Sequence, residues 1–297
     1  MSPEMNSDFA KAGQIAGIAL QYGKTLIRRD AVIAEVLDKI EASIRELGGE
    51  IAFPAQVALN ETAAHFCPED YDATFGDDLV SLDIGAHVNG YVGDTALTVD
   101  LSGRYGDLMK ASRNALAAAV KAVGLGAKIG DIGAAIESEI EGFGYKPVQN
   151  LSGHGLGKYQ IHTSPSIPNV DNGDRAELTE GMTIAVEPFA TDGIGMVGEK
   201  GDPSIFMLTG NKPVRVGFVR DIRKEVDSLH GLPFTTRWLT RRFGEAKVQY
   251  AFNQFRQLGI LHDFPPLVEK QGGMVSQAEH SFYIGEKTLI TTKVDKG

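Results

Sequence analysis

The chain has 297 residues, enough for one sizeable hydrophobic core. Hydrophobic residues make up 42% and charged residues 23%, ordinary values that exclude disordered and fibrous classes. The formal net charge of −10 argues against specific nucleic-acid binding, and the single cysteine, Cys67, excludes an intrachain disulfide. Because no window approaches 18 consecutive apolar residues and the first eight residues do not resemble a signal peptide, we expect a cytoplasmic protein without membrane contact.

Two helices are predicted near the amino-terminal end. The first spans residues 9–27. The second begins after Asp30, its expected N-cap, and ends at the pair Gly48 and Gly49. Its apolar residues recur at helical spacing and predict a buried face of Ile33, Leu37, Ile40, Ile44 and Leu47.

A β-hairpin is predicted around Asn89-Gly90, which alternating apolar residues flank on both sides. With this turn Asp83 pairs with Ala96, so Asp94 shares a sheet face with Asp83 as its diagonal neighbour. Diagonal neighbours lie about 7–8 Å apart at the backbone. Two solvated acids on an edge hairpin are the alternative, but carboxylates in apolar strands need a partner or a cation. We therefore expect a metal ion between them.

The chain then repeats the order of two helices followed by strands. One helix is predicted over residues 106–123, with Leu116, Val120 and Val123 on one face. The next begins at Asp131, and its apolar face is predicted to contain Ile132, Ile136, Ile140 and Phe143.

Three further residues have contexts that favour metal ligands. His154 stands between glycines, Glu187 follows an apolar strand and precedes a proline, and Glu279 leads into a strand-like segment. Each of them alone is more often a structural polar group than a ligand. With the two aspartates they form an oxygen-rich set that suits Mn, Fe or Co in paired sites better than a structural zinc site.

The ordered set Asp, Asp, His, Glu, Glu closely resembles the ligands of the methionine aminopeptidases, and the resemblance runs from about Asp8 to Thr292. The motifs in residues 53–65 and the long stretch between Glu187 and Glu279 resemble the type II branch. The chain lacks the charged amino-terminal extension of eukaryotic type II enzymes, which is compatible with an archaeal source and does not establish it.

The resemblance implies an α/β (α+β) pita-bread fold, in which two related halves meet at the metals. It implies a single catalytic domain over residues 1–297, with a helical subdomain inserted at about 214–266. The basic residues of the insertion suggest a ribosomal RNA contact or, more commonly, a solvated helix face: Arg220, Arg223, Lys224, Arg237, Arg241 and Arg242.

The resemblance also implies two divalent ions per chain, as Co, Mn, Fe or Zn. Asp94 and Glu279 would bridge them, Asp83 would complete one ion, and His154 and Glu187 the other. Glu279 would in addition move protons between the attacking water and the leaving group.

Three more residues resemble substrate-binding residues of the family. His162, eight positions after His154, would stabilise the developing oxyanion. His65 and Phe53 would line the pocket for the methionine side chain, and in type II enzymes the histidine that matches His65 is alkylated by fumagillin. Three departures from the family pattern concern the pocket lining: Ile205, Phe264 and Ala278.

The implied function is removal of the initiator methionine from nascent proteins and peptides with a free N-terminal methionine and a small second residue. A cytoplasmic monomer is expected, with the ribosome as a further partner. Two alternatives stay open. An Xaa-Pro peptidase of the prolidase or aminopeptidase P type usually has a large domain before the first ligand, and here Asp83 leaves little space for one. A non-catalytic pita-bread binding protein would have lost ligands, whereas all five are present.

Overall fold

The computed structural model describes residues 7–68 and 71–294. Most of the first eight residues, which are predicted not to form a signal peptide, lie outside the described residues. Both ends of the predicted domain 1–297 lie outside them as well. Within the described ranges, none of the helices combines the length and hydrophobicity needed to cross a bilayer.

Both helices predicted at the amino-terminal end form, as α1 (Ser7–Leu26) and α2 (Ile33–Glu46). Helix α2 buries most of its predicted face, namely Ile33, Leu37, Ile40 and Ile44. The 3.6-residue period of apolar side chains is therefore sufficient to identify which side of this helix faces the core.

Two details at the ends of α2 are wrong in the sequence prediction. Val32, rather than Asp30, is the N-cap, and no side chain caps the helix. Asp30 has a positive φ of 65° and its N–H donates to the carbonyl of Phe75, so it belongs to the preceding turn. Leu47 is 38% exposed because it is the C-cap, where the chain leaves the helix before Gly48.

The first sheet has the antiparallel order β1-β3-β4. Its strands are β1 (Glu50–Leu59), β3 (Leu79–Val88) and β4 (Tyr91–Asp100). The predicted hairpin register is confirmed, since Asp83 pairs with Ala96. Asn89 and Gly90 have φ values of 51° and 89°, as a two-residue turn with two left-handed positions requires.

The second half contains the two predicted helices and a five-stranded sheet of order β17-β16-β8-β6-β7. The helices are α3 (Gly106–Ala122) and α4 (Ile129–Gly142). The strands are β6 (Ser152–Gly157), β7 (Gln160–Pro168), β8 (Thr183–Val186), β16 (His280–Tyr283) and β17 (Leu289–Ile290). The predicted apolar faces of the helices are buried, except that Val120 and Phe143 are only partly covered.

Three small sheets surround these two. One contains β10 (Val197–Glu199), β14 (Leu267–Glu269) and β2 (Thr62–Ala64). Another contains β15 (Val275–Gln277), β9 (Phe189–Thr191) and β5 (Lys146–Pro147). The third contains β12 (Phe234–Thr235), β11 (Ile205–Leu208) and β13 (Leu261–Phe264).

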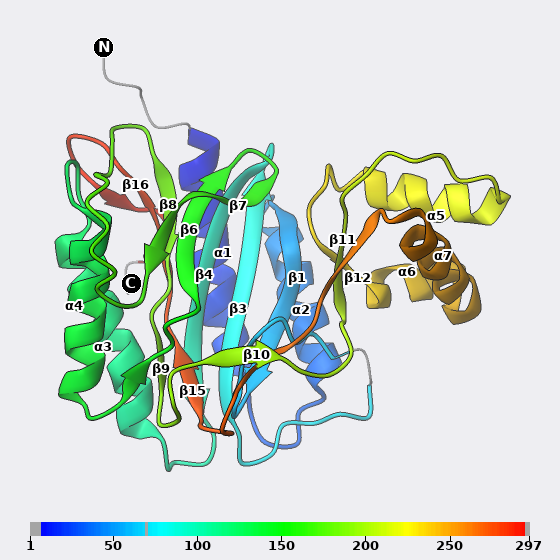
Figure 1. Cartoon of the computed structure of the whole chain (residues 1–297). Helices are drawn as coiled ribbons and strands as arrows, with labels where there is room; N and C mark the ends of the chain where they lie inside the picture. Colours follow the sequence, from blue (N-terminus) through cyan, green and yellow to red (C-terminus); the bar gives the residue numbers. More distant parts are fainter. Residues whose placement is uncertain (1–6, 69–70, 295–297) are drawn as a thin grey trace.

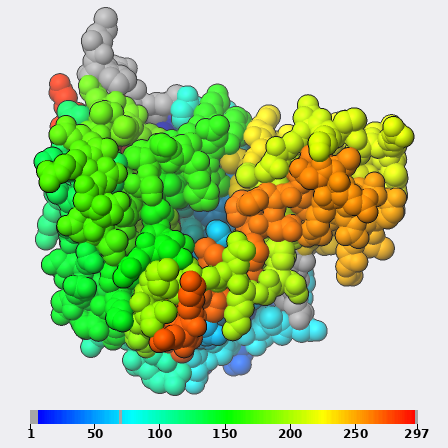
Figure 2. Space-filling view, viewed as in Figure 1, coloured from blue at the N-terminus to red at the C-terminus, as the bar shows by residue number. Residues whose placement is uncertain are grey.

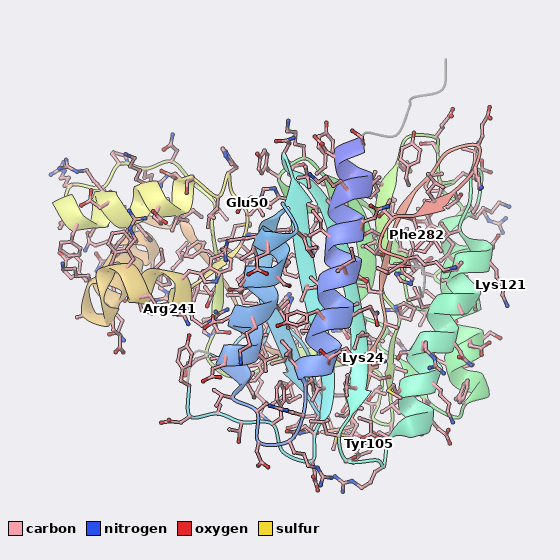
Figure 3. The ribbon with its side chains drawn as sticks, turned by 180° about the vertical axis from the view of Figure 1, so that it is seen from behind. Lys24, Glu50, Tyr105, Lys121, Arg241 and Phe282 are labelled. Carbon is pink, nitrogen blue, oxygen red and sulfur yellow. The ribbon has the colours of Figure 1, made fainter. Side chains whose placement is uncertain are left out.

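Helices α1 to α4 all lie on the same side of the strands, as the view from behind in Figure 3 shows. Helix α1 crosses β4 at backbone contact, because a Cβ on Gly93 would lie 2.5 Å from the Cα of Gly13. Successive residues of a strand point to opposite faces. Since Gly93 faces α1, its neighbour Asp94 points away from this helix.

The stretch 214–266 contains α5 (Gly217–Asp227), α6 (Thr236–Phe243) and α7 (Glu245–Leu258), which stand to the right of the sheets in Figure 1. These helices share a hydrophobic cluster that includes Val248, Phe252 and Phe255, all from α7. Gly259 is the C-cap of α7 and adopts the left-handed conformation that glycine commonly has at this position. The division into a catalytic domain and an inserted subdomain stays a prediction.

Arg237 contradicts the prediction of a solvated basic face. It is 2% exposed, and Nη2 lies 2.7 Å from Glu41, with Asp38 as a second partner. The reason is that α6 packs with this side towards α2, whose carboxylates neutralise the guanidinium. Arg220, Lys224, Arg241 and Arg242 are exposed, and Arg223 is partly covered.

Candidate metal centre

One cavity of about 370 Å³ is lined by all eight predicted site residues. Figure 2 shows a hollow in this face, between the green second half and the yellow and orange helical stretch, with amino-terminal strands at its base. The eight residues are Phe53, His65, Asp83, Asp94, His154, His162, Glu187 and Glu279.

Strand pairing brings the candidate ligands together from both halves. Asp83 and Asp94 come from β3 and β4, and His154 from the middle of β6. Strands β16 and β8 are antiparallel, with His280 opposite Val186, so that Glu187 and Glu279 leave the sheet side by side. The N–H of Glu279 donates to the carbonyl of Ala96 at 3.0 Å, which ties this segment to β4.

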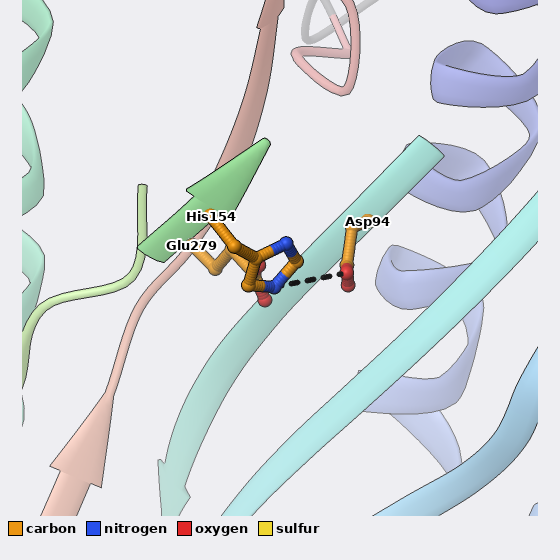
Figure 4. Close-up of side chains that lie close together, drawn as sticks. All are labelled: Asp94, His154 and Glu279. Carbon is orange, nitrogen blue, oxygen red and sulfur yellow. Dashed lines mark ion pairs between the residues drawn. The ribbon is translucent and has the colours of Figure 1, made fainter. Parts of the chain in front are cut away.

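The ligand atoms of Asp94, His154 and Glu279 all lie within 4.8 Å of one another. Figure 4 shows Nε2 of His154 turned towards Asp94, with the Glu279 carboxylate beside it. Nε2 lies 3.8 Å from Oδ2 of Asp94 and 3.5 Å from Oε1 of Glu187. This is the arrangement of a chelating cluster, with donor atoms converging on a shared space.

The electrostatics of the four carboxylates call for a cation. Burial raises the pKa of Asp83 to about 7. Burial, followed by repulsion from the neighbouring carboxylates, raises the pKa values of Asp94, Glu187 and Glu279 well above their ordinary range. Three of the oxygens are buried without a hydrogen bond among the described residues: Asp83 Oδ1, Asp94 Oδ1 and Glu279 Oε2. Divalent cations would satisfy these oxygens and neutralise the charge, so the donor set fits a metal centre.

His154 has the protonation state that a metal ligand needs. Nδ1 lies 3.3 Å from the Gly155 carbonyl, and because a carbonyl only accepts, we assign the proton to Nδ1. Nε2 then presents its lone pair to the carboxylates. Burial, with a smaller effect of His162, lowers the pKa of His154 to about 3 and keeps the ring neutral.

His162 and His65 approach the centre from two walls of the cavity. The ring of His162 lies 4.4 Å from that of His154, and although His162 is exposed into the cavity, the surrounding protein displaces enough solvent to lower its pKa. Burial lowers the pKa of His65 to about 4, and its ring lies 5.4 Å from that of Phe264 in an edge contact. Both imidazoles are therefore neutral near pH 7.

Of the three residues that depart from the family pattern, two line the cavity and one does not. Ile205 and Phe264 line the cavity and pair with each other between β11 and β13. Ala278 is buried, and its N–H donates to the carbonyl of Pro188 at 3.2 Å. It does not line the cavity, so only the first two bear on the pocket wall.

Two buried glutamines that the sequence interpretation missed contact the candidate ligands. Nε2 of Gln277 donates to Oε2 of Glu187 at 3.3 Å. The alternation of a strand could have revealed this residue, because it precedes Glu279 by two positions. Nε2 of Gln56 lies 3.4 Å from Oδ2 of Asp83. No sequence signal for Gln56 was available, because a bulge in β1 determines its direction.

The comparisons with known proteins agree with this geometry. Residues 7–219 match the model of Metallopeptidase family M24. A methionine aminopeptidase from Archaeoglobus fulgidus is 41% identical over 99% of this chain and 100% of its own length. One from Methanocaldococcus jannaschii is 40% identical over 95% of this chain and 97% of its own. The chain belongs to the methionine aminopeptidases of this family.

A third relative, a methionine aminopeptidase 2, agrees with the predicted type II branch. Methionine aminopeptidase 2 of Clavispora lusitaniae is 34% identical over 97% of this chain and 71% of its own length. The family prediction is thus confirmed.

Solved structures confirm the pita-bread fold. A methionine aminopeptidase from Thermotoga maritima has a TM-score of 0.72 at 23% identity, covering 99% of this chain and 100% of that chain. A prolidase from Pyrococcus furiosus has a TM-score of 0.62 at 19% identity, covering 98% of this chain and 64% of that chain. Because both activities occur on this fold, the fold alone does not separate them.

Proposed function

We propose that the protein removes methionine from the N-terminus of peptides and nascent proteins whose second residue is small. The observation that carries the proposal is the convergence of five candidate ligands in one cavity with His162, His65 and Phe53. The relatives named methionine aminopeptidase, at about 40% identity over nearly the whole chain, support the same activity.

Two divalent ions are the proposed cofactors, held by Asp83, Asp94, His154, Glu187 and Glu279. Bound there, they would lower the pKa of a water molecule and polarise the scissile carbonyl. Four carboxylates and one imidazole are hard donors, which favour Mn, Fe or Co.

The protein's own groups would move protons and stabilise charge. Glu279 accepts the proton of the attacking water and returns it to the leaving amine, a role that suits a carboxylate whose pKa burial raises well above its ordinary range. His162 donates an N–H to the oxyanion that develops on the scissile carbonyl. Its neutral ring, facing the cavity, matches that role.

The methionine side chain is proposed to bind against His65 and Phe53, with Ile205 and Phe264 completing an apolar wall. Aromatic rings contact a thioether favourably. A narrow space beside this wall would reject a bulky second residue, because the excluded atoms cannot be accommodated without displacing the substrate from the catalytic groups.

One chain supplies every group of the proposed centre, and we infer that it acts as a monomer. Nascent polypeptides are the proposed substrates in the cell, which makes the ribosome the expected place of encounter.

Three tripeptides test the proposal: Met-Ala-Ser, Met-Lys-Ser and Ala-Pro-Ser, each assayed with the metal-loaded protein. We expect release of methionine from Met-Ala-Ser, slower release from Met-Lys-Ser, and no cleavage of Ala-Pro-Ser. Preference for Ala-Pro-Ser would instead support a prolidase-type activity. Cleavage of none of the three would support a binding protein.

A further inference from the structure

Gln56 joins two parts of the candidate site through one buried side-chain amide. Its Oε1 accepts the backbone N–H of His65 at 2.7 Å. Because a backbone N–H only donates, the amide oxygen must face His65, and the amide nitrogen therefore points the other way. There Nε2 lies 3.4 Å from Oδ2 of Asp83, at the long end of the hydrogen-bond range.

A β-bulge in β1 turns Gln56 towards the cavity. Phe53 lies opposite Gly85 and Gln56 lies opposite Asp83, so three steps along β1 correspond to two steps along β3. Regular alternation would place Phe53 and Gln56 on opposite faces of the sheet, whereas both line the cavity. Pro54 stands within the bulge, where a missing N–H removes no ladder hydrogen bond.

The bulge is held from behind by Glu41 of α2. Its Oε1 accepts the N–H of Ala55 at 3.3 Å. The same carboxylate accepts from Nη2 of Arg237 at 2.7 Å and from Nε1 of Trp238 at 2.9 Å, both on α6. Glu41 is 3% exposed, so these contacts fix it in place. The position of Gln56 is thus set by two helices outside the cavity.

Both partners of Gln56 have unusual local states. His65 has a φ of 63°, in the left-handed region that residues with a side chain seldom adopt. The hydrogen bond from its N–H to Gln56 helps to hold that conformation. Asp83 has Oδ2 next to the amide, while Oδ1 is buried and has no hydrogen bond among the described residues. The amide therefore holds one carboxylate oxygen and leaves the other for a cation.

We propose that Gln56 is a positioning residue that couples the methionine pocket to the metal centre. It fixes the backbone of His65 in the conformation that presents the ring to the pocket, and it orients Asp83 for metal binding. The assignment of methionine to the pocket rests on the proposed function, whereas the link to Asp83 concerns metal affinity alone.

The test uses Gln56→Met, which keeps the length of the side chain and removes the amide. Calorimetry would measure Co²⁺ binding to the chelated full-length protein, and then L-methionine binding to the Co²⁺-loaded protein. We expect the Co²⁺ dissociation constant to rise about 10- to 100-fold, as loss of a hydrogen-bond partner of a metal ligand typically causes. We expect the dissociation constant of methionine to rise about tenfold, the effect of one hydrogen bond.

A conservative variant separates the two contacts. Gln56→Glu keeps an acceptor oxygen for the His65 N–H, so methionine affinity should return most of the way to that of the unmodified protein. If Gln56→Glu binds methionine as weakly as Gln56→Met, the acceptor role towards His65 is wrong.

Asn60, directly after the end of β1, provides a matched control beside the same pair of strands. Its amide also has two contacts, donating to Asp78 at 2.8 Å and accepting from the N–H of Leu79 at 3.1 Å, and it does not line the cavity. Asn60→Gly tolerates the positive φ of this position and should leave both dissociation constants unchanged.

Two results would overturn the proposal. One is Gln56→Met with unchanged binding of both Co²⁺ and methionine. The other is an equal loss of affinity in Asn60→Gly, which would indicate general loosening of the strands. If the unmodified protein neither binds methionine nor cleaves Met-Ala-Ser, the proposed function fails, and the Co²⁺ comparison still decides the link to Asp83.

Discussion

The ring of Phe53 lies against the backbone of Gly85 on the neighbouring strand. A Cβ at Gly85 would lie 2.6 Å from Cδ1 of Phe53 and closer still to Cε1. Any side chain at position 85 would therefore displace the Phe53 ring. The ring would move into the cavity that it lines, because the packed interior leaves no room for it elsewhere. We expect Gly85→Ala to raise KM for Met-Ala-Ser about tenfold, because misplaced pocket contacts typically cost 1–3 kcal/mol.

Gly106→Ala is the control for this variant, because a Cβ at that position meets no atom within 4 Å. It should leave KM unchanged. Metal content should be normal in both variants. A normal KM in Gly85→Ala would show that Phe53 does not form the pocket wall.

The role of His162 predicts a loss of turnover without a loss of metal. His162→Ala removes the N–H that is proposed to stabilise the oxyanion, so kcat should fall roughly 10²- to 10³-fold, as removal of one such donor does. Metal content, measured by atomic emission, should equal that of the unmodified protein. Loss of metal in His162→Ala would mean that His162 is itself a metal ligand and not only a hydrogen-bond donor to the oxyanion.

The position of His65 predicts selective alkylation by fumagillin. An imidazole attacks an epoxide only when it is neutral, and burial lowers the pKa of His65 to about 4. Its Nδ1 has no hydrogen bond among the described residues. Peptide mass spectrometry should find the adduct on His65 alone, and His65→Asn should resist the compound while keeping its metals. An adduct on another histidine would show that the assignment of His65 to the methionine pocket is wrong.

Removal of the metals predicts an unusual pH dependence of stability. The pKa of Asp83 is about 7 in the folded protein against an ordinary value of 3.8, and those of Asp94, Glu187 and Glu279 are also raised. The metal-free folded state therefore binds more protons than the unfolded state, so its stability falls as the pH rises through 7. The histidines with lowered pKa values act in the opposite direction only below about pH 6.5.

Thermal unfolding between pH 6.5 and 8.5 measures this effect. The midpoint of the chelated protein should decrease with pH, and that of the metal-loaded protein should not. Asp83→Asn, which removes one buried charge, should raise the midpoint of the chelated protein at the upper end of this range. A chelated protein that becomes more stable between these pH values would contradict the assignment of repelling carboxylates.

In the hairpin, a local pattern was sufficient to predict the direction of the site residues. The turn at Asn89-Gly90 fixes the register of the hairpin, and that register places Asp83 and Asp94 on one face. Residues without such a pattern were missed. Gln56 faces the cavity only because of the bulge beside it, and Arg237 is buried only because α6 packs against α2. Both depend on contacts between segments far apart in the sequence, which no local periodicity records.

Methionine release by the chelated protein during a titration with Mn²⁺ shows whether the five converging residues form a catalytic metal centre. With Met-Ala-Ser as substrate, we expect no turnover before addition and full turnover after one or two ions per chain. Glu279→Ala should remain inactive at every metal concentration, because it removes both a proposed bridging ligand and the proton shuttle. Full activity of Glu279→Ala after exhaustive chelation would contradict both the metal centre and the catalytic role of Glu279.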